Sequence, residues 1–325
     1  MINNNNIINN NNNKKINSIS NKHLLQDWIL ATRPWSFPAS IIPLLVSLFY
    51  VFFISSKIDG IVYEEINLLN GLLVMVSVIL FHSSANLISD YNDFFKGVDR
   101  KDTYGSKILT DGLFFPISIL KFGFLLFIVA SIIGFYVLFT SKSQLALFIL
   151  GIIAAINVIF YYKFKFKAFG ELSIFISFAI LPTITMSYVL LNTFNLHLLL
   201  ISIPIGLITT AILFANNVRD IYTDKRAGII TIAMLLGLKK SQNLYTILIL
   251  IPFITIILFV IFDILPLTSL LFLLVFPISL KNLNMMRKVV SNGVESIATL
   301  DVMTAKLQLI SGFILILSLI FAIII

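Results

Sequence analysis

The sequence predicts an all-α, polytopic membrane protein. Of its 325 residues, 58% are hydrophobic and only 12% are charged, and the mean hydropathy is +1.00. Soluble domains contain about 45–50% apolar and about 25% charged residues, so this composition excludes a soluble enzyme. The apolar stretches reach the roughly 20 residues that a bilayer-spanning helix requires. They lack the alternation of apolar and polar residues that a membrane β-barrel requires.

The first 23 residues differ from the rest of the chain. They are mostly Asn with a few Ile, Lys and Ser residues, and they show no apolar periodicity. Such a segment cannot bury enough apolar surface to fold, so we expect residues 1–23 to form a disordered tail. The segment also lacks the apolar stretch and the cleavage site of a secretory signal. The membrane domain is predicted to occupy residues 24–325.

Nine apolar stretches follow, each about 18 to 24 residues long. Their centres lie near Leu45, Val78, Phe127, Ile153, Ala179, Ile208, Leu250, Phe272 and Leu315. Little more than residues 263–266 separates the seventh stretch from the eighth, so this boundary is the hardest to place. The sequence therefore predicts nine transmembrane helices.

Basic residues indicate the orientation, because cytoplasmic loops collect Lys and Arg. If the N-terminus is cytoplasmic, all 23 basic residues except Lys57 and Lys142 fall in cytoplasmic segments. We therefore predict a cytoplasmic N-terminus. The same pattern explains the net charge of +8 without a nucleic-acid partner. The chain contains no cysteine, which excludes a disulfide, a thiolate metal site and a Cys nucleophile.

Acidic residues are scarce, yet seven of the fifteen lie in two predicted cytoplasmic loops. The first group follows the second span and contains Asp90, Asp93 and Asp99, with Asp102 and Asp111 further along. If the helix continues beyond residue 89, Asp90 and Asp93 lie on one face. At this spacing the two carboxylates can share a divalent cation.

The second acidic group follows the sixth span. Asp220 and Asp224 are four residues apart, which again predicts one helical face, and Arg219, Lys225 and Arg226 are their neighbours in the sequence. Carboxylates bind a hard cation and basic side chains bind phosphate oxygens, so the two groups together suit a polyphosphate bridged by Mg²⁺. A single acidic pair beside a span is most often a solvated helix end, whereas two such pairs favour a binding site. Because the site lies at the ends of membrane helices, we expect the rest of the substrate to be lipid.

Four stretches of the sequence resemble the UbiA superfamily of intramembrane aromatic prenyltransferases, and most closely its menaquinone and vitamin K2 branch. They are residues 33–39 (RPWSFPA), 90–99 (DYNDFFKGVD), 216–228 (NNVRDIYTDKRAG) and 231–237 (TIAMLLG). The third stretch is the most specific. The resemblance implies nine transmembrane helices around a central cavity, with a cap formed by the two Asp-rich loops.

The resemblance also implies a function and a set of site residues. The expected reaction is Mg²⁺-dependent transfer of a prenyl group from an allylic prenyl diphosphate to an aromatic quinone precursor, of the 1,4-dihydroxy-2-naphthoate or menadiol type. The resemblance implies that Asp90, Asp93, Asp220 and Asp224 are catalytic and bind Mg²⁺, with Asp99 as a supporting metal ligand. The candidate diphosphate-binding residues are Asn86, Ser89, Lys107, Lys163, Asn216, Asn217, Arg219, Lys225 and Arg226. The expected location is a membrane of the endoplasmic reticulum, the Golgi or the mitochondrion.

The chain departs from the family pattern at two positions. Ser89 stands where the family has an Asn, and Asn86, about one turn earlier, could partly replace that amide. Lys107 stands where the family has an Arg, which keeps the charge but loses the bidentate phosphate geometry.

Three further residues have two interpretations each. Lys163 lies in a loop that alternates basic and aromatic residues, and either a phosphate clamp or a membrane anchor fits this pattern. His82 lies within the second span, where a hydrogen-bonded structural role is favoured over catalysis. Glu171 matches an acidic position of the family. The alternative is that Glu171 is an acidic residue at the membrane edge with no role in the site.

Other functions stay open. A 4-hydroxybenzoate polyprenyltransferase of ubiquinone biosynthesis and a haem O synthase belong to the same superfamily. A transporter would place its acidic residues near the midplane of the membrane, whereas here they lie at the ends of spans. A non-catalytic regulator that senses prenyl diphosphate becomes more credible because of Ser89, and turnover by the purified protein would exclude it.

Overall fold

The computed structural model describes residues 24–57 and 66–325, and within them it contains nine helical segments long and apolar enough to cross a membrane. All nine predicted centres fall inside these segments, including the two that a short turn at residues 262–266 separates. The predicted tail at residues 1–23 lies outside the described residues. The nine spans are Pro34–Lys57, Leu68–Lys96, Pro116–Thr140, Gln144–Lys165, Gly170–Leu191, Leu196–Arg219, Ile232–Ile261, Leu267–Asn292 and Val294–Ile324.

The spans are built from longer and shorter helices, and a few additional helices lie outside them. In chain order the elements are α2 (Leu25–Ala31), η1 (Pro34–Ser36), α3 (Pro38–Lys57), α4 (Leu68–Lys96), α5 (Pro116–Thr140), α6 (Gln144–Lys165), α7 (Gly170–Phe175), η3 (Ile176–Ile180), α8 (Leu181–Leu191), α9 (Leu196–Arg219), α10 (Ile221–Arg226), α11 (Ile232–Ile261), η4 (Leu267–Val275), α12 (Phe276–Arg287), α13 (Val289–Asn292), η5 (Val294–Ile297) and α14 (Leu300–Ile324).

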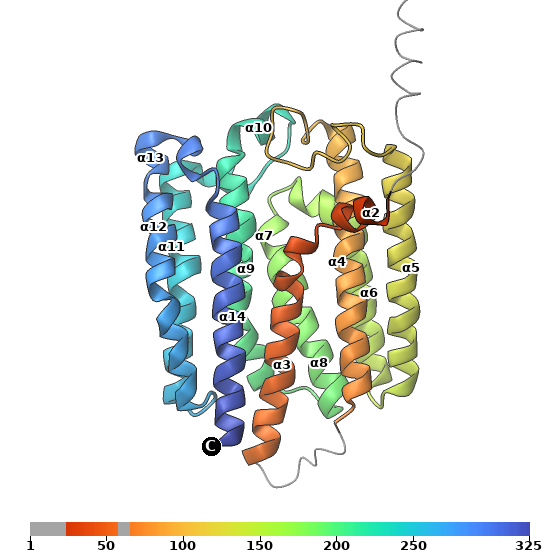
Figure 1. Ribbon diagram of the computed structural model, residues 1–325, viewed down its shortest axis with the longest axis vertical. Helices are drawn as coiled ribbons and strands as arrows, with labels where there is room; N and C mark the ends of the chain where they lie inside the picture. Colours follow the sequence, from red (N-terminus) through yellow and green to blue (C-terminus); the bar gives the residue numbers. More distant parts are fainter. Residues whose placement is uncertain (1–23, 58–65) are drawn as a thin grey trace, which may run out of the picture.

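The long helices run side by side, and the two Asp-rich loops lie at the same end of the bundle (Figure 1). The loop after α4 and the short helix α10 meet there, and in this view α2 lies below them, in front of α4 (Figure 1). The C-terminus lies at the opposite end, as does Lys57 at the end of α3 (Figure 1). This arrangement brings the two acidic groups together at the end of the bundle opposite the C-terminus (Figure 1).

Small residues allow the helices to approach closely. A Cβ atom at Gly206 of α9 would overlap Ala179 of η3, and one at Gly312 of α14 would overlap Ile42 of α3. Lipid tails are as apolar as the side chains, so helix association in a membrane depends on such close packing. The fifth span contains a π-helical turn, η3, and such turns often occur at functional sites.

The cap is attached to the bundle by its own apolar cluster. Leu109 and Phe114 of the loop after α4 pack with Leu87 of α4 and Ile119 of α5. Trp28 of α2 covers them, and its ring centroid lies 4.5 Å from that of Phe114. A second, larger apolar core has members in all nine spans of the described chain. The loop that carries Asp99 is therefore packed in place.

Candidate functional site

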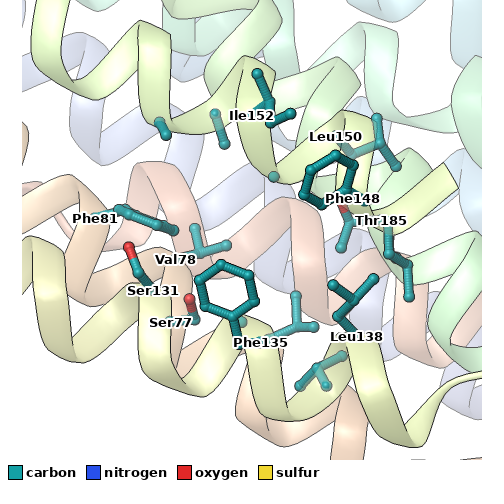
Figure 2. A pocket seen from close by; sticks show the side chains of 17 residues that line it. Ser77, Val78, Phe81, Ser131, Phe135, Leu138, Phe148, Leu150, Ile152 and Thr185 are labelled. Atoms are coloured by element: carbon teal, nitrogen blue, oxygen red, sulfur yellow. The ribbon is translucent and has the colours of Figure 1, made fainter. Parts of the chain in front are cut away.

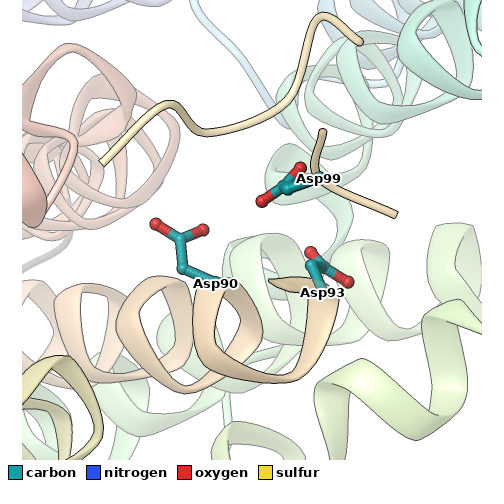
Figure 3. Close-up of side chains that lie close together, drawn as sticks. All are labelled: Asp90, Asp93 and Asp99. Atoms are coloured by element: carbon teal, nitrogen blue, oxygen red, sulfur yellow. The ribbon is translucent and has the colours of Figure 1, made fainter. Parts of the chain in front are cut away.

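Three carboxylates of the first acidic group meet at one point. Helix α4 continues to Lys96, which places Asp90 and Asp93 on one face as the spacing predicts. Gly97 then ends the helix in the left-handed conformation (φ 72°), which glycine adopts without steric cost, and the chain turns back. The turn brings Asp99 above the helix end (Figure 3). One oxygen from each carboxylate lies within 4.8 Å of the others, and all three residues are buried.

The loop approaches Asp99 very closely at Gly105. A Cβ atom at this position would overlap the Asp99 carboxylate, so only glycine fits without displacing it. The backbone of the loop thus closes over the three carboxylates.

Two basic side chains pair with these carboxylates. Arg33 forms an ion pair with Asp90, and Lys165 Nζ lies 2.9 Å from Asp93 Oδ2. Ser89 Oγ donates a hydrogen bond of 3.2 Å to the same Asp93 oxygen. Neither Arg33 nor Lys165 was among the predicted site residues. Arg33 belongs to one of the four stretches that resemble the family, and Lys165 lies in the same alternating segment as Lys163.

The second acidic group is arranged differently from the prediction. Asp220 ends α9 and precedes α10, so Asp220 and Asp224 do not share one continuous helix. The Asp224 N–H still donates to the Asp220 carbonyl at 2.8 Å, which keeps the two residues together. Arg219 binds both oxygens of Asp220, at 2.8 and 2.9 Å, and Asp301 at 2.7 Å. Its guanidinium therefore organises the acidic side chains at this side of the cap.

Both acidic groups line one polar cavity of about 520 Å³. Lys165, Arg33 and Asp301 also line it. The predicted site residues found in its wall are Asn86, Ser89, Asp93, Asp99, Lys107, Asn216, Asn217, Arg219, Asp220 and Asp224. Asp90 joins them through the cluster of three carboxylates.

Three of the predicted diphosphate-binding residues lie outside this cavity. Lys163 is exposed and its Nζ lies over the Phe160 ring, 4.8 Å from the centroid, because the two-residue step along α6 turns it away from Lys165. Lys225 is exposed. Arg226 is also exposed and pairs at 2.9 Å with Asp102, which links the two loops.

Two amides and one lysine of the cavity wall are engaged in the structure. Lys107 Nζ donates to the backbone carbonyls of Arg100, Lys101 and Thr103, so it fastens its own loop. Asn217 donates a 2.8 Å hydrogen bond to the buried Glu171. This hydrogen bond holds the Asn217 side chain against α7. Asn86 Nδ2 donates to the carbonyl of Thr32 at 3.2 Å.

Burial and mutual repulsion perturb two of the carboxyl groups. Burial raises the pKa of Asp99 to about 7, and the charges of Asp93 and Asp90 add to this rise. Burial also raises the pKa of Asp224 to about 7, against the opposing effect of Lys165. Carboxylates that are crowded in this way are stabilised by a bound cation.

The donor set fits a hard divalent cation. Asp93 Oδ1 is buried and has no hydrogen-bond partner within the described part of the chain. A buried carboxylate oxygen without a partner is costly, and metal coordination removes that cost. Oxygen ligands from several carboxylates are the preferred environment of Mg²⁺ and Ca²⁺. Asp90, Asp93 and Asp99 are thus able to hold such an ion.

The polar cavity continues into an apolar one. A second cavity of about 260 Å³ shares Arg33, Asn86, Tyr161, Leu213 and Asn216 with the first. A third, of about 230 Å³, shares Val78, Phe81, Ala154 and Thr185 with the second. Mostly apolar side chains of α4, α5 and α6 surround this third cavity, and Thr185 of α8 completes its wall (Figure 2). The acidic site therefore opens onto an apolar path inside the bundle.

Fold and site together define an integral membrane protein with an acid-lined cation site above an intramembrane apolar chamber. The chain belongs to the UbiA prenyltransferase family, whose family model matches residues 60–289.

Known proteins of this family resemble the chain in sequence and in structure. It is 32% identical over 238 residues to UbiA prenyltransferase domain-containing protein 1 of Xenopus tropicalis, which covers 72% of this chain and 66% of the relative. The chain thus spans slightly less than two thirds of that relative. The apo structure of a UbiA homolog from Aeropyrum pernix K1 superposes with a TM-score of 0.61 at 14% identity, over 86% of this chain and 97% of that one. The structure of a UbiA homolog from Archaeoglobus fulgidus bound to GPP and Mg²⁺ superposes with a TM-score of 0.56 at 13% identity. The superposition covers 89% of this chain and 99% of that one.

Proposed function

We propose that this protein transfers a prenyl group from an allylic prenyl diphosphate to a hydroxylated aromatic acceptor, with Mg²⁺ as cofactor. We further propose that the acceptor is of the 1,4-dihydroxy-2-naphthoate or menadiol type, as in menaquinone and vitamin K2 biosynthesis. The observation that carries the proposal is the convergence of both Asp-rich loops on one polar cavity that continues into an apolar chamber. Such a site suits a ligand with an anionic head and an apolar chain.

Charge complementarity supports the assignment of the head group. Six carboxylates face four basic side chains in and around the polar cavity: Asp90, Asp93, Asp99, Asp220, Asp224 and Asp301 against Arg33, Lys107, Lys165 and Arg219. The excess of negative charge disfavours a bare diphosphate and favours a diphosphate that arrives with divalent cations. The Archaeoglobus fulgidus homolog was solved with such a pair, GPP and Mg²⁺.

The proposed reaction breaks one bond and forms another, and the site stabilises the diphosphate that leaves. The allylic C–O bond breaks and its electron pair leaves with the diphosphate. A ring carbon of the acceptor supplies the pair for the new C–C bond, and the ring then loses a proton. When bound, Mg²⁺ neutralises the charge that develops on the leaving group. Lys165, held beside Asp93, offers N–H donors to the phosphate oxygens.

The apolar chamber keeps water away from the allylic cation. Water would convert this cation to a prenyl alcohol, and exclusion of water prevents such side reactions. The walls of the third cavity are almost entirely apolar, with Phe81, Phe135 and Phe148 among them (Figure 2). We assign this cavity to the prenyl chain.

The experiment that tests the proposal is a product assay with purified protein in lipid nanodiscs. Mg²⁺, labelled prenyl diphosphates of several lengths and either 1,4-dihydroxy-2-naphthoate or 4-hydroxybenzoate are supplied. We expect Mg²⁺-dependent prenylation of the naphthoate. Prenylation of 4-hydroxybenzoate alone would assign the protein to ubiquinone biosynthesis instead. Binding of prenyl diphosphate without turnover of any acceptor would indicate a regulator.

A further inference from the structure

His82 is an ionisable side chain inside the membrane domain that the site described above does not use. It lies on α4 in the wall of the 260 Å³ cavity, below the acidic cap. Eight residues separate it from Asp90, which is about 12 Å along the helix axis. Ionisable residues at such positions are rare and costly, and they commonly mark functional sites.

The two ring nitrogens of His82 face different hydroxyl groups. Nδ1 lies 2.6 Å from Ser40 Oγ, and Nε2 lies 3.3 Å from Ser36 Oγ. Ser36 Oγ already donates its proton to the Arg33 carbonyl at 2.7 Å, so it can only accept from Nε2. Nε2 therefore carries the proton, and in the neutral ring Nδ1 accepts from Ser40. The hydrogen bond between Ser40 and Nδ1 is short, whereas the hydrogen bond from Nε2–H to Ser36 is longer than normal.

The surroundings of His82 suit a flat aromatic ligand. Phe178 lies in the π-helical turn η3, and its ring centroid is 4.8 Å from that of His82. The ring centroid of Phe37 is 5.9 Å from that of His82. Aromatic walls bind an aromatic ring by edge-to-face or offset contacts. The weakly bonded Nε2–H supplies one donor among these walls, and an oxygen atom on the ligand ring would accept from it.

Of the two reactants, only the aromatic acceptor brings an oxygen atom to this depth. The prenyl chain has none, and its diphosphate belongs at the cap. Asn86 lies in the walls of both the polar and the apolar cavity, one helical turn above His82. One helical turn rises about 6 Å from His82 to Asn86. An aromatic ring hydrogen-bonded to His82 therefore reaches toward an allylic carbon held under the cap.

We propose that His82 Nε2–H donates a hydrogen bond to a ring oxygen of the aromatic acceptor and thereby holds the acceptor beside the allylic carbon. This inference rests on the proposed prenyl transfer and adds a binding residue for its second substrate. The alternative is that His82 only joins α3 to α4 through Ser40.

Two variants separate these roles, because Asn and Gln carry their amide groups at different distances from the backbone. The amide of His82→Asn lies near the position of Nδ1 and keeps the bond to Ser40, but it loses the donor at Nε2. The amide of His82→Gln reaches the position of Nε2. Acceptor binding predicts that His82→Asn raises the KM for the acceptor about tenfold, and that His82→Gln raises it much less.

The assay uses full-length protein in nanodiscs, with 1,4-dihydroxy-2-naphthoate as acceptor and the prenyl diphosphate that the wild type uses best. Calorimetry measures the Kd of the Mg²⁺–prenyl diphosphate in parallel, and we expect it to be unchanged in both variants. A joint loss of affinity for both substrates, or a greater impairment of His82→Gln than of His82→Asn, would show a structural role and overturn the inference. If the wild type transfers no prenyl group, the proposed function itself fails. If it does, and His82→Asn keeps its KM, only the inference fails.

Discussion

Lys165 and Lys163 are two residues apart on α6 but occupy different environments. Lys165 pairs with Asp93 in the polar cavity, whereas Lys163 is exposed beside aromatic rings. We predict that Lys165→Gln weakens binding of the Mg²⁺–prenyl diphosphate about ten- to a hundredfold, because it removes a charged hydrogen-bond donor. Lys163→Gln is the matched control and should leave the Kd unchanged. Calorimetry on both variants checks this prediction. Equal effects would mean that the loss reflects the overall positive charge at the end of α6.

Ser89 is buried and donates to Asp93, at the position where related proteins are expected to carry an Asn. We predict that Ser89→Asn leaves activity unchanged or lowers the Mg²⁺ requirement, because an amide can make the same bond and also reach the ligand. Steady-state rates over a Mg²⁺ titration measure this effect. Loss of activity in a folded Ser89→Asn protein would contradict the assignment and would make Asn86 the functional amide.

Asp99 and Asp224 give the site a predicted pH dependence. Each has a pKa raised to about 7 by burial, so protons compete with the metal below neutral pH. Affinity for Mg²⁺ is expected to rise with pH and to level off above pH 8. Protonation of each carboxylate between pH 8 and pH 6 should lower the Mg²⁺ affinity about tenfold. Calorimetric Mg²⁺ titrations at several pH values check this, and Asp99→Asn should make the dependence shallower. A flat profile in the wild type would contradict it.

At the scale of elements, the third cavity between α4, α5, α6 and α8 makes a prediction about the prenyl chain. Gly134 of α5 and Gly151 of α6 line this cavity, and a Cβ atom at either position would meet no other atom within 4 Å. We predict that Gly134→Leu or Gly151→Leu fills the cavity and lowers transfer from long prenyl diphosphates more than from short ones. Competition between diphosphates of different length measures the shift.

The control for this experiment is Ile132→Phe, which adds volume on the exposed face of α5. It should leave the preference for chain length unchanged. If all three variants lower transfer from long and short prenyl diphosphates equally, the prenyl chain does not enter this cavity.

Much of this arrangement was predictable at the level of elements. Hydropathy located all nine spans, because a helix in lipid must be apolar over its full length. The spacing of Asp90 and Asp93 predicted their common face on α4. Two features were not accessible from sequence. The break between α9 and α10 falls at Asp220, where no Gly or Pro marks it. The choice of Lys165 over Lys163 depends on how α6 is rotated in the bundle, which packing sets.

At the scale of the whole molecule, the cap joins two halves of the chain that carry one acidic group each. Arg226 pairs with Asp102 across the two loops, and the Arg219 guanidinium lies 4.7 Å from the Tyr104 ring centroid. The first pair is exposed and contributes little stability, so the loops depend on packing at their bases. The cavity exists only where the two loops meet, and the function is a property of the complete bundle.

The central claim is that both acidic groups hold one metal-bridged diphosphate. The most direct measurement is calorimetric binding of a prenyl diphosphate in the presence of Mg²⁺ to wild-type protein, Asp93→Ala and Asp224→Ala in nanodiscs. Asp111→Ala serves as control, because Asp111 is exposed in the same loop as Asp99 and lies outside the cavity wall. We predict that Asp93→Ala and Asp224→Ala each abolish Mg²⁺-dependent binding and prenyl transfer, while Asp111→Ala keeps both. Normal binding in a folded Asp93→Ala or Asp224→Ala protein would contradict the account.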